Sequence, residues 1–171
     1  MRLDQVVPLI CSHAPAAGHL TTPLAETGLH AWYVFERAGA FTPLMAHHLE
    51  VLQVHPDRLH PIAIDNLWDR LGALTFHRYS SLEPYHVIGG NPLLASSVLL
   101  PEVWRLMATE VAGELVGRVH NSHWITFAGA GEAPAIEHQR LAGDGLSLLA
   151  VDAEVPPRPR FGLEELGIFA A

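Results

Sequence analysis

The chain has 171 residues, of which 49% are hydrophobic, and its ten basic residues against 18 acidic ones give a formal net charge of −8. The length suits one domain that buries about 70% of the surface of its unfolded chain, and the negative charge argues against nucleic acid and anionic membranes as partners, because both attract basic residues. All ten basic residues are arginine, and a chain without lysine excludes Schiff-base chemistry, a Walker-A phosphate site and a serine nucleophile with a lysine base.

The first third of the chain is predicted to consist mainly of strands. Residues 5–12 predict a strand whose proline places it at a sheet edge or limits it to a short run, because proline has no N–H to donate. Residues 13–28, a mixture of Ala, Pro, Gly and Thr, predict an irregular loop. The β-branched and aromatic run at 30–37 predicts the clearest strand, followed by a turn and a second run at 41–45. Weak alternation predicts one more strand at 47–54.

A helix is predicted over residues 55–71, because apolar residues recur there on one face at helical spacing. Pro61 lies inside this range and predicts a kink or a later helical start. A pair of strands follows at 73–80 and 84–90. The apolar row of the helix consists of Leu59, Ala63, Leu67 and Leu71.

The stretch from Gly90 to Ala130 is predicted to form the centre of the fold. It begins with an apolar helix over residues 91–112, in which Pro101 predicts a break near Leu100 because its ring clashes with the preceding turn. Apolar and β-branched residues on both sides of the sequence HNSH then predict a hairpin. The elements after the hairpin are a helix at 134–142, a strand at 146–151 and a proline-rich extended segment at 155–171.

The order of these elements predicts the fold class. Strand pairs alternate with helices three times along the chain, which indicates repeated strand-pair-then-helix units. Hairpins give antiparallel pairing, and a sheet face and a helix face must each be covered by the other. We therefore expect an α+β fold, with helices packed on a mostly antiparallel sheet, in a single domain over residues 1–171.

Several short motifs occur in the order in which a known bacterial family carries them. They are VPLI at 7–10, the aromatic strand at 31–35, Ala63 with Asn66-Leu67, ASSVLL at 95–100 and GELVGRV at 113–119. Over most of its length the chain resembles the C-terminal portion of the YtpQ-type proteins, whose function is uncharacterised. The resemblance implies the fold and transfers no activity. The family often has a proline, a basic residue and an aspartate at the hairpin turn, where this chain has His120, Ser122 and His123.

His120 and His123 are the candidate metal ligands. If Asn121 and Ser122 form a two-residue turn, the two histidines are its closing pair, with Cβ atoms about 5 Å apart on one face. A zinc site needs at least a third ligand, and the spacing supplies none. We therefore predict two partly exposed turn histidines and no cofactor, with a zinc site as the alternative.

Asn66 and Cys11 are the other two residues with a predicted role. Asn66 lies beside the apolar row of the helix at 55–71, so we expect its amide to tie that helix to the backbone of a neighbouring strand or loop. Cys11 is the only cysteine and is predicted to be a buried small hydrophobe. A single cysteine allows no internal disulfide, which favours a cytoplasmic location.

The sequence contains no convergent set of catalytic motifs. We therefore expect a cytoplasmic, non-enzymatic protein-interaction or adaptor domain that binds a protein partner or forms a homodimer, with no nucleic acid or membrane as a partner. The alternative is a hydrolase-like, metal-binding enzyme that uses His120 and His123 with an acid such as Glu132.

Overall fold

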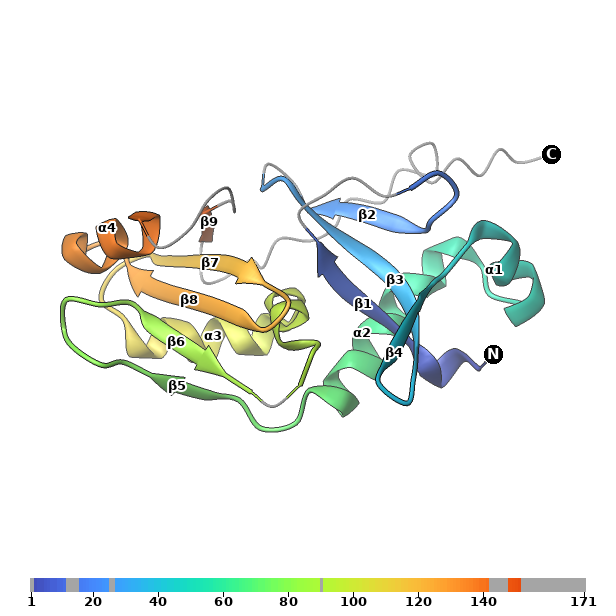
Figure 1. Ribbon diagram of the computed structural model, residues 1–171, viewed down its shortest axis with the longest axis horizontal. Coiled ribbons are helices and arrows are strands. Elements are labelled where there is room, and N and C mark those ends of the chain that lie inside the picture. Colours follow the sequence, from blue (N-terminus) through green and yellow to red (C-terminus); the bar gives the residue numbers. More distant parts are fainter. Residues whose placement is uncertain (1, 12–15, 25–26, 90, 142–147, 152–171) are drawn as a thin grey trace. The chain divides into compact units, whose positions relative to one another are not determined.

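The structure is a computed structural model, and it describes residues 2–11, 16–24, 27–89, 91–141 and 148–151. The described residues form two compact units, of which the first ends at Arg70 and the second begins at Leu71. Each unit contains an antiparallel sheet and helices (Figure 1), which confirms the α+β class. The single domain stays a prediction, and the segment at 155–171 lies outside the described residues.

The sheet of the first unit is built on β3 (Leu29–Arg37). This strand pairs with β1 (Val6–Cys11) on one side and with β2 (Thr21–Leu24) and β4 (Ala40–Pro43) on the other, all antiparallel. A short 3-10 helix, η1 (Leu3–Gln5), precedes β1. Among the described strands β1 pairs with β3 alone, so its predicted place at an edge is confirmed.

β2 lies inside the stretch at 13–28 that the sequence analysis assigned to a loop, so that prediction was wrong at this point. The strand has four residues, one of them a proline, and so short a segment carries no readable alternation. It pairs antiparallel with β3, from Thr21 opposite Trp32 to Leu24 opposite Leu29. The residue before it, Leu20, accepts from Tyr33 N at 3.0 Å and donates to Leu44 O at 2.9 Å.

The strand predicted at 47–54 is also corrected, because these residues form the helix α1 (Ala46–Leu52). The backbone N–H of Met45 donates to Nδ1 of His48 at 2.9 Å, which satisfies a backbone donor at the start of the helix. Leu49 is buried and anchors α1 to the core. Local capping and one anchoring leucine therefore outweigh the weak alternation of the sequence.

The helix predicted at 55–71 is confirmed as α2 (Pro56–Leu71), and Pro61 lies within it. The predicted apolar row is its buried face, with 5% exposure or less for Leu59, Ala63, Leu67 and Leu71. Leu59 and Ala63 belong to a core cluster that also contains residues of β1, β3 and α1. The other fully or nearly buried members of this cluster are Val6, Leu20, Tyr33, Phe35, Leu44 and Leu49.

The sheet of the second unit has five antiparallel strands in the order β5-β6-β8-β7-β9. The two predicted hairpins supply the first four strands, and the last described segment supplies the fifth. The strands are β5 (Thr75–His77), β6 (Tyr85–Ile88), β7 (Leu115–Asn121), β8 (Trp124–Gly129) and β9 (Leu148–Val151).

The helix predicted at 91–112 is two elements, a buried 3-10 helix η2 (Leu94–Leu99) and an α-helix α3 (Pro101–Glu110). The two elements separate at Leu100, where the sequence predicts a break. Pro101 fits the first turn of α3 but could not lie in the interior of a continuous helix. In Figure 1, α3 lies along one face of the second sheet.

The contact between α3 and the sheet depends on a glycine. A Cβ atom placed on Gly117 of β7 would lie 3.0 Å from Cη2 of Trp104, so only a glycine lets the indole approach this closely. Trp104 is 1% exposed, and its Nε1 donates to the carbonyl of Val98 at 2.6 Å. The last helix, α4 (Ala133–Leu141), follows β8 as predicted. None of the described helices has the length and apolar character needed to cross a membrane.

Candidate functional site

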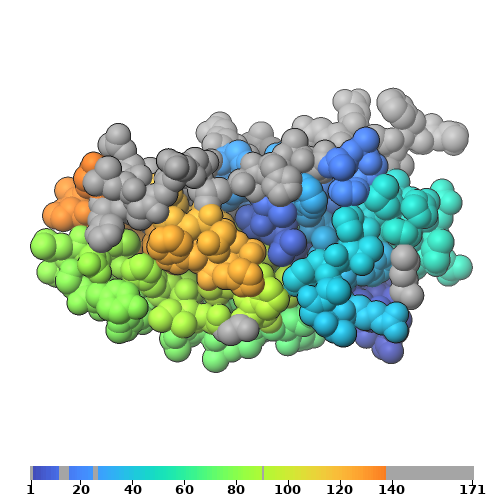
Figure 2. All heavy atoms as spheres, viewed as in Figure 1, coloured from blue at the N-terminus to red at the C-terminus, as the bar shows by residue number. Residues whose placement is uncertain are grey.

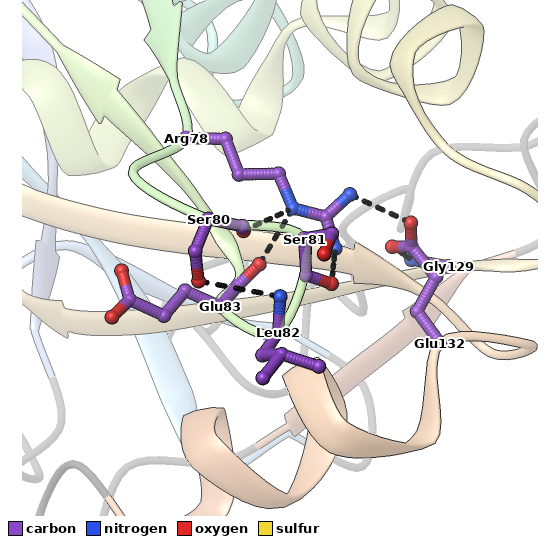
Figure 3. A network of polar contacts seen from close by, with 7 residues as sticks. All are labelled: Arg78, Ser80, Ser81, Leu82, Glu83, Gly129 and Glu132. Carbon is purple, nitrogen blue, oxygen red and sulfur yellow. Dashed lines mark hydrogen bonds and ion pairs between the residues drawn. The ribbon is translucent and has the colours of Figure 1, made fainter.

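The loop between β5 and β6, residues 78–84, is folded around the guanidinium group of Arg78 (Figure 3). Nε of Arg78 donates to the carbonyl oxygens of Ser80 at 3.0 Å and Glu83 at 2.7 Å, and Nη2 donates to the carbonyl of Ser81 at 2.8 Å. Three carbonyls of one short loop thus converge on a single planar cation. Hydrogen bonds to a charged group are the stronger kind, so Arg78 holds the loop backbone in one conformation. We call these residues the Arg78 loop.

Arg78 also ties this loop to the turn between β8 and α4. Its Nη1 donates to Glu132 at 2.8 Å, and the other carboxylate oxygen of Glu132 accepts from the backbone N–H of Gly129 at 2.9 Å (Figure 3). Both side chains are mostly buried, with 16% and 20% exposed. Burial raises the pKa of Glu132, but the hydrogen bonds from Gly129 and Arg78 outweigh it, so the pKa lies below its usual value. The pair is therefore charged and fixed at neutral pH.

Two apolar side chains of the Arg78 loop point into solvent. Tyr79 is 70% exposed and Leu82 is 63% exposed, and Ile88 at the end of β6 adds a third exposed side chain at 48%. The space-filling view shows green atoms from the region of β5 and β6 at the molecular surface (Figure 2). Tyrosine is among the residues that contribute most to binding energy at protein interfaces. A fixed loop that exposes such residues has the character of a contact surface.

The ring of Tyr79 is itself held by two histidines. It makes edge-on contacts with His77 of β5, at 4.4 Å between ring centres, and with His86 of β6, at 5.4 Å. The two histidines lie opposite each other in the β5–β6 pairing. Tyr79 is thus exposed but supported from below by the sheet, which reduces the conformational entropy that it would lose on binding.

A row of rings continues from His86 across the sheet to the β7–β8 hairpin. Nε1 of Trp124 donates to Nδ1 of His86 at 3.2 Å, and the indole of Trp124 stacks on His120 at 4.0 Å between ring centres. Nε2 of His120 lies 2.8 Å from the hydroxyl oxygen of Thr126. His120 is therefore held by a stacking contact and a hydrogen bond.

The structure corrects the predicted geometry of the two hairpin histidines. Asn121 pairs with Trp124, so the turn consists of Ser122 and His123, and the register shifts between Val119 and Asn121. His120 is the extra residue of this β-bulge. His120 and His123 are not the closing pair of a two-residue turn, and the reason is that the bulge moves the pairing by one residue.

The two histidines differ in their surroundings. His123 is exposed, and its backbone N–H donates to Oδ1 of Asn121 at 2.8 Å. Burial, together with the nearby charge of Arg118 and the proximity of His86, lowers the pKa of His120 from 6.5 to about 4. In the part of the chain that the structure describes, no three His, Cys, Asp or Glu side chains gather as a metal site would require. The zinc site at His120 and His123, the alternative to two turn histidines, stays untested.

The pair of His120 and Thr126 has the separation of a general base and a hydroxyl nucleophile. Two properties oppose catalysis by this pair. Thr126 is 1% exposed, and an imidazole with a pKa of about 4 is a weak base at neutral pH. Glu132, the acid of the alternative hypothesis, is engaged by Arg78. These features favour a structural role for the pair.

Asn66 connects α2 to the start of the first sheet. Its Nδ2 donates to the carbonyl oxygens of Leu3 at 2.7 Å and Val6 at 2.8 Å, one in η1 and one in β1. These are contacts of the kind expected for a half-buried amide beside an apolar row. Their contribution to stability stays a prediction. Cys11 is partly exposed rather than buried, because it is the last residue of an edge strand.

No sequence motif marks Arg78 as a functional residue. The guanidinium binds main-chain carbonyls, which every residue carries, and a glutamate 54 positions away. The one available signal was an arginine near the end of the strand predicted at 73–80, because a charge beside a sheet commonly needs a partner. That signal indicates an anchoring role without identifying the partner.

Comparisons with known proteins give no relative for this chain. No family model, no curated protein and no solved structure matches it.

Proposed function

We propose that the chain is a non-enzymatic protein-interaction or adaptor module of the YtpQ type, that it works in the cytoplasm, and that the Arg78 loop is its contact surface. One observation carries the proposal: Tyr79 and Leu82 are 70% and 63% exposed on a loop whose carbonyls are bound by Arg78. A loop that is already ordered gives up little conformational entropy when it binds. Exposed apolar residues at such a place favour a protein partner.

The test is affinity capture from the native cell with three versions of the full chain. These are the wild type, the double variant Tyr79→Ala with Leu82→Ala, and the control Leu106→Ala. Leu106 lies on α3 in the same unit and is 55% exposed, so it matches the loop residues in exposure. We expect a partner that the wild type and the control retain and the double variant loses, confirmed by direct binding of the purified partner. Equal capture by all three versions would reject the Arg78 loop as the contact surface.

Self-association is a second form of the same proposal, and β1, at one edge of the described sheet of the first unit, is a candidate strand for it. Light scattering during size exclusion tests it directly. A strict monomer at high protein concentration would reject the homodimer and leave a different partner.

The metal-enzyme alternative has its own test. The interaction proposal expects no zinc-dependent rise in melting temperature. A rise that His120→Ala abolishes would favour the alternative, because a metal that binds only the folded state stabilises it.

A further inference from the structure

We propose that the partner segment bound by the Arg78 loop carries an apolar side chain flanked by lysine or arginine. This inference rests on the proposed function and specifies the chemistry of the partner. The apolar part follows from the exposure of Tyr79 and Leu82. The basic part follows from the balance of charge at the surface of the second unit.

The β5–β6 hairpin contains two formal charges, and only the positive one is paired with an opposite charge inside the protein. The positive charge of Arg78 is opposed by Glu132 at 2.8 Å, and its side chain is 16% exposed. The negative charge belongs to Glu83, whose backbone carbonyl accepts from Arg78 while its carboxylate points away from the guanidinium (Figure 3). Within the described residues no ion pair involves Glu83. Glu83 is partly exposed, so the charge of the loop that lacks an ion pair within the described residues is negative.

The rest of the described surface of the second unit has the same sign. Glu110 and Glu114 are exposed. Arg118 is 5% exposed, and Arg105, whose side chain is 66% exposed, lies 3.8 Å from the carboxylate of Glu102. Among the charged side chains that the structure describes in this unit, the exposed ones are mostly acidic.

The charge decides between classes of partner. At the Arg78 loop, a second copy of the chain, with its net charge of −8, is less favourable than a basic segment, as is an acidic segment. A segment with lysine or arginine beside its apolar anchor gains attraction to Glu83. The exposed ring of Tyr79 adds a surface on which a cationic side chain can lie.

The test uses a random peptide library displayed on phage and selected at pH 7.5 on the full chain. Peptides that bind the wild type and the Leu106→Ala control, but not the double variant of Tyr79 and Leu82, define the ligands of the loop. We expect these peptides to share an apolar residue next to lysine or arginine. One such peptide, made synthetically, should bind about 30-fold more weakly to Tyr79→Ala, as for a central interface residue. It should bind about two- to fivefold more weakly to Glu83→Gln, as for a charge at an interface rim, and more weakly still as salt is raised.

Two results separate the failure of this inference from the failure of the proposed function. Peptides that depend on Tyr79 and Leu82 but lack basic residues, or that bind Glu83→Gln as tightly as the wild type, would overturn the inference and leave the interaction function standing. A library that yields no peptide dependent on Tyr79 and Leu82 would overturn both.

Discussion

The hydroxyl oxygen of Tyr33 lies 3.0 Å from Nδ1 of His60, and this contact joins the central strand β3 to α2. The same hydroxyl lies 3.1 Å from Oγ1 of Thr22 on β2, so three elements of the first unit meet at one buried oxygen. Burial raises the pKa of Tyr33, an effect that the hydrogen bond with Thr22 only partly offsets. Burial also lowers the pKa of His60 from 6.5 to about 4. The protein therefore holds both groups in their neutral forms.

Acid should weaken the first unit through His60. As the pH falls below about 6.5, the histidine of the unfolded chain takes up a proton that the folded chain accepts only near pH 4. The contribution of His60 is thus complete above pH 6.5 and is lost between pH 6.5 and 4, by up to about 3 kcal/mol. Urea unfolding at pH 7 and pH 5 measures the loss. His60→Gln should reduce this pH dependence, whereas His55→Gln, at a site 66% exposed, should keep it. An unchanged pH dependence in His60→Gln would contradict the prediction.

Removal of Arg78 should release its loop. Arg78→Ala removes four hydrogen bonds and leaves the mostly buried carboxylate of Glu132 without its cation, so we expect a loss of about 2–4 kcal/mol in the free energy of unfolding. Amide hydrogen exchange of residues 79–83 should become faster. The control is Arg105→Ala, which removes an exposed pair at 3.8 Å and should change stability by less than about 0.5 kcal/mol. Equal effects of the two substitutions would rule out a bracing role for Arg78.

Arg78→Lys tests the geometry rather than the charge. A lysine ammonium keeps the positive charge but lacks the planar, forked arrangement of donors. We expect it to keep the contact with Glu132 and to lose some of those with the three loop carbonyls, so that exchange in the loop lies between the wild type and Arg78→Ala. Wild-type exchange in Arg78→Lys would show that charge alone fixes the loop.

Asn66→Leu should destabilise the first unit. The substitution leaves the carbonyls of Leu3 and Val6 without their amide donor, at a cost of about 1–2 kcal/mol. The midpoint of urea unfolding measures the change. Asp65→Ala, at the exposed neighbouring position of α2, is the matched control and should have little effect. Unchanged stability in Asn66→Leu would contradict a structural role for the amide.

Gly129 and Gly131 give a prediction about close packing at the end of β8. A Cβ atom on Gly129 would overlap the carbonyl oxygen of Ala112, whereas a Cβ atom on Gly131 would lie 3.5 Å from the same oxygen, an ordinary contact. We therefore expect Gly129→Ala to lower the melting temperature by several degrees through a displaced backbone, at a cost of about 2 kcal/mol or more. Gly131→Ala should stay near the wild type. A thermal melt of both variants decides the matter, and similar melting temperatures would contradict it.

Helices and strands could be predicted from the sequence where many residues repeat one pattern. β3 has nine residues, which alternately face the core over much of its length, and α2 has four apolar residues on one face. A single residue that departs from such a pattern does not change the prediction. β2 and α1 are shorter, with four and seven residues, and their conformations depend on pairing to β3 and on the cap formed by His48. Such tertiary and capping contacts override a weak local preference.

The candidate site was less predictable than the fold for a related reason. The bulge at His120 depends on which residue of β8 pairs with Asn121, and a shift of one residue changes no composition or spacing in the sequence. The role of Arg78 depends on carbonyl groups, which are identical in every residue, and on the distant Glu132. Sequence periodicity reports which side chains face the core, and it does not report which backbone groups a side chain will bind.

The capture of three loop carbonyls by Arg78 also affects how the molecule resists aggregation. β5 is the outermost strand on its side of the described five-stranded sheet and has only three residues. The chain beyond it curls around the guanidinium, so the carbonyls of Ser80, Ser81 and Glu83 are turned inward and cannot accept hydrogen bonds from an added strand. A short edge that ends in an occupied loop offers no template for strand-by-strand growth. The arginine that fixes the loop thereby also protects the exposed edge of the sheet from pairing with other strands.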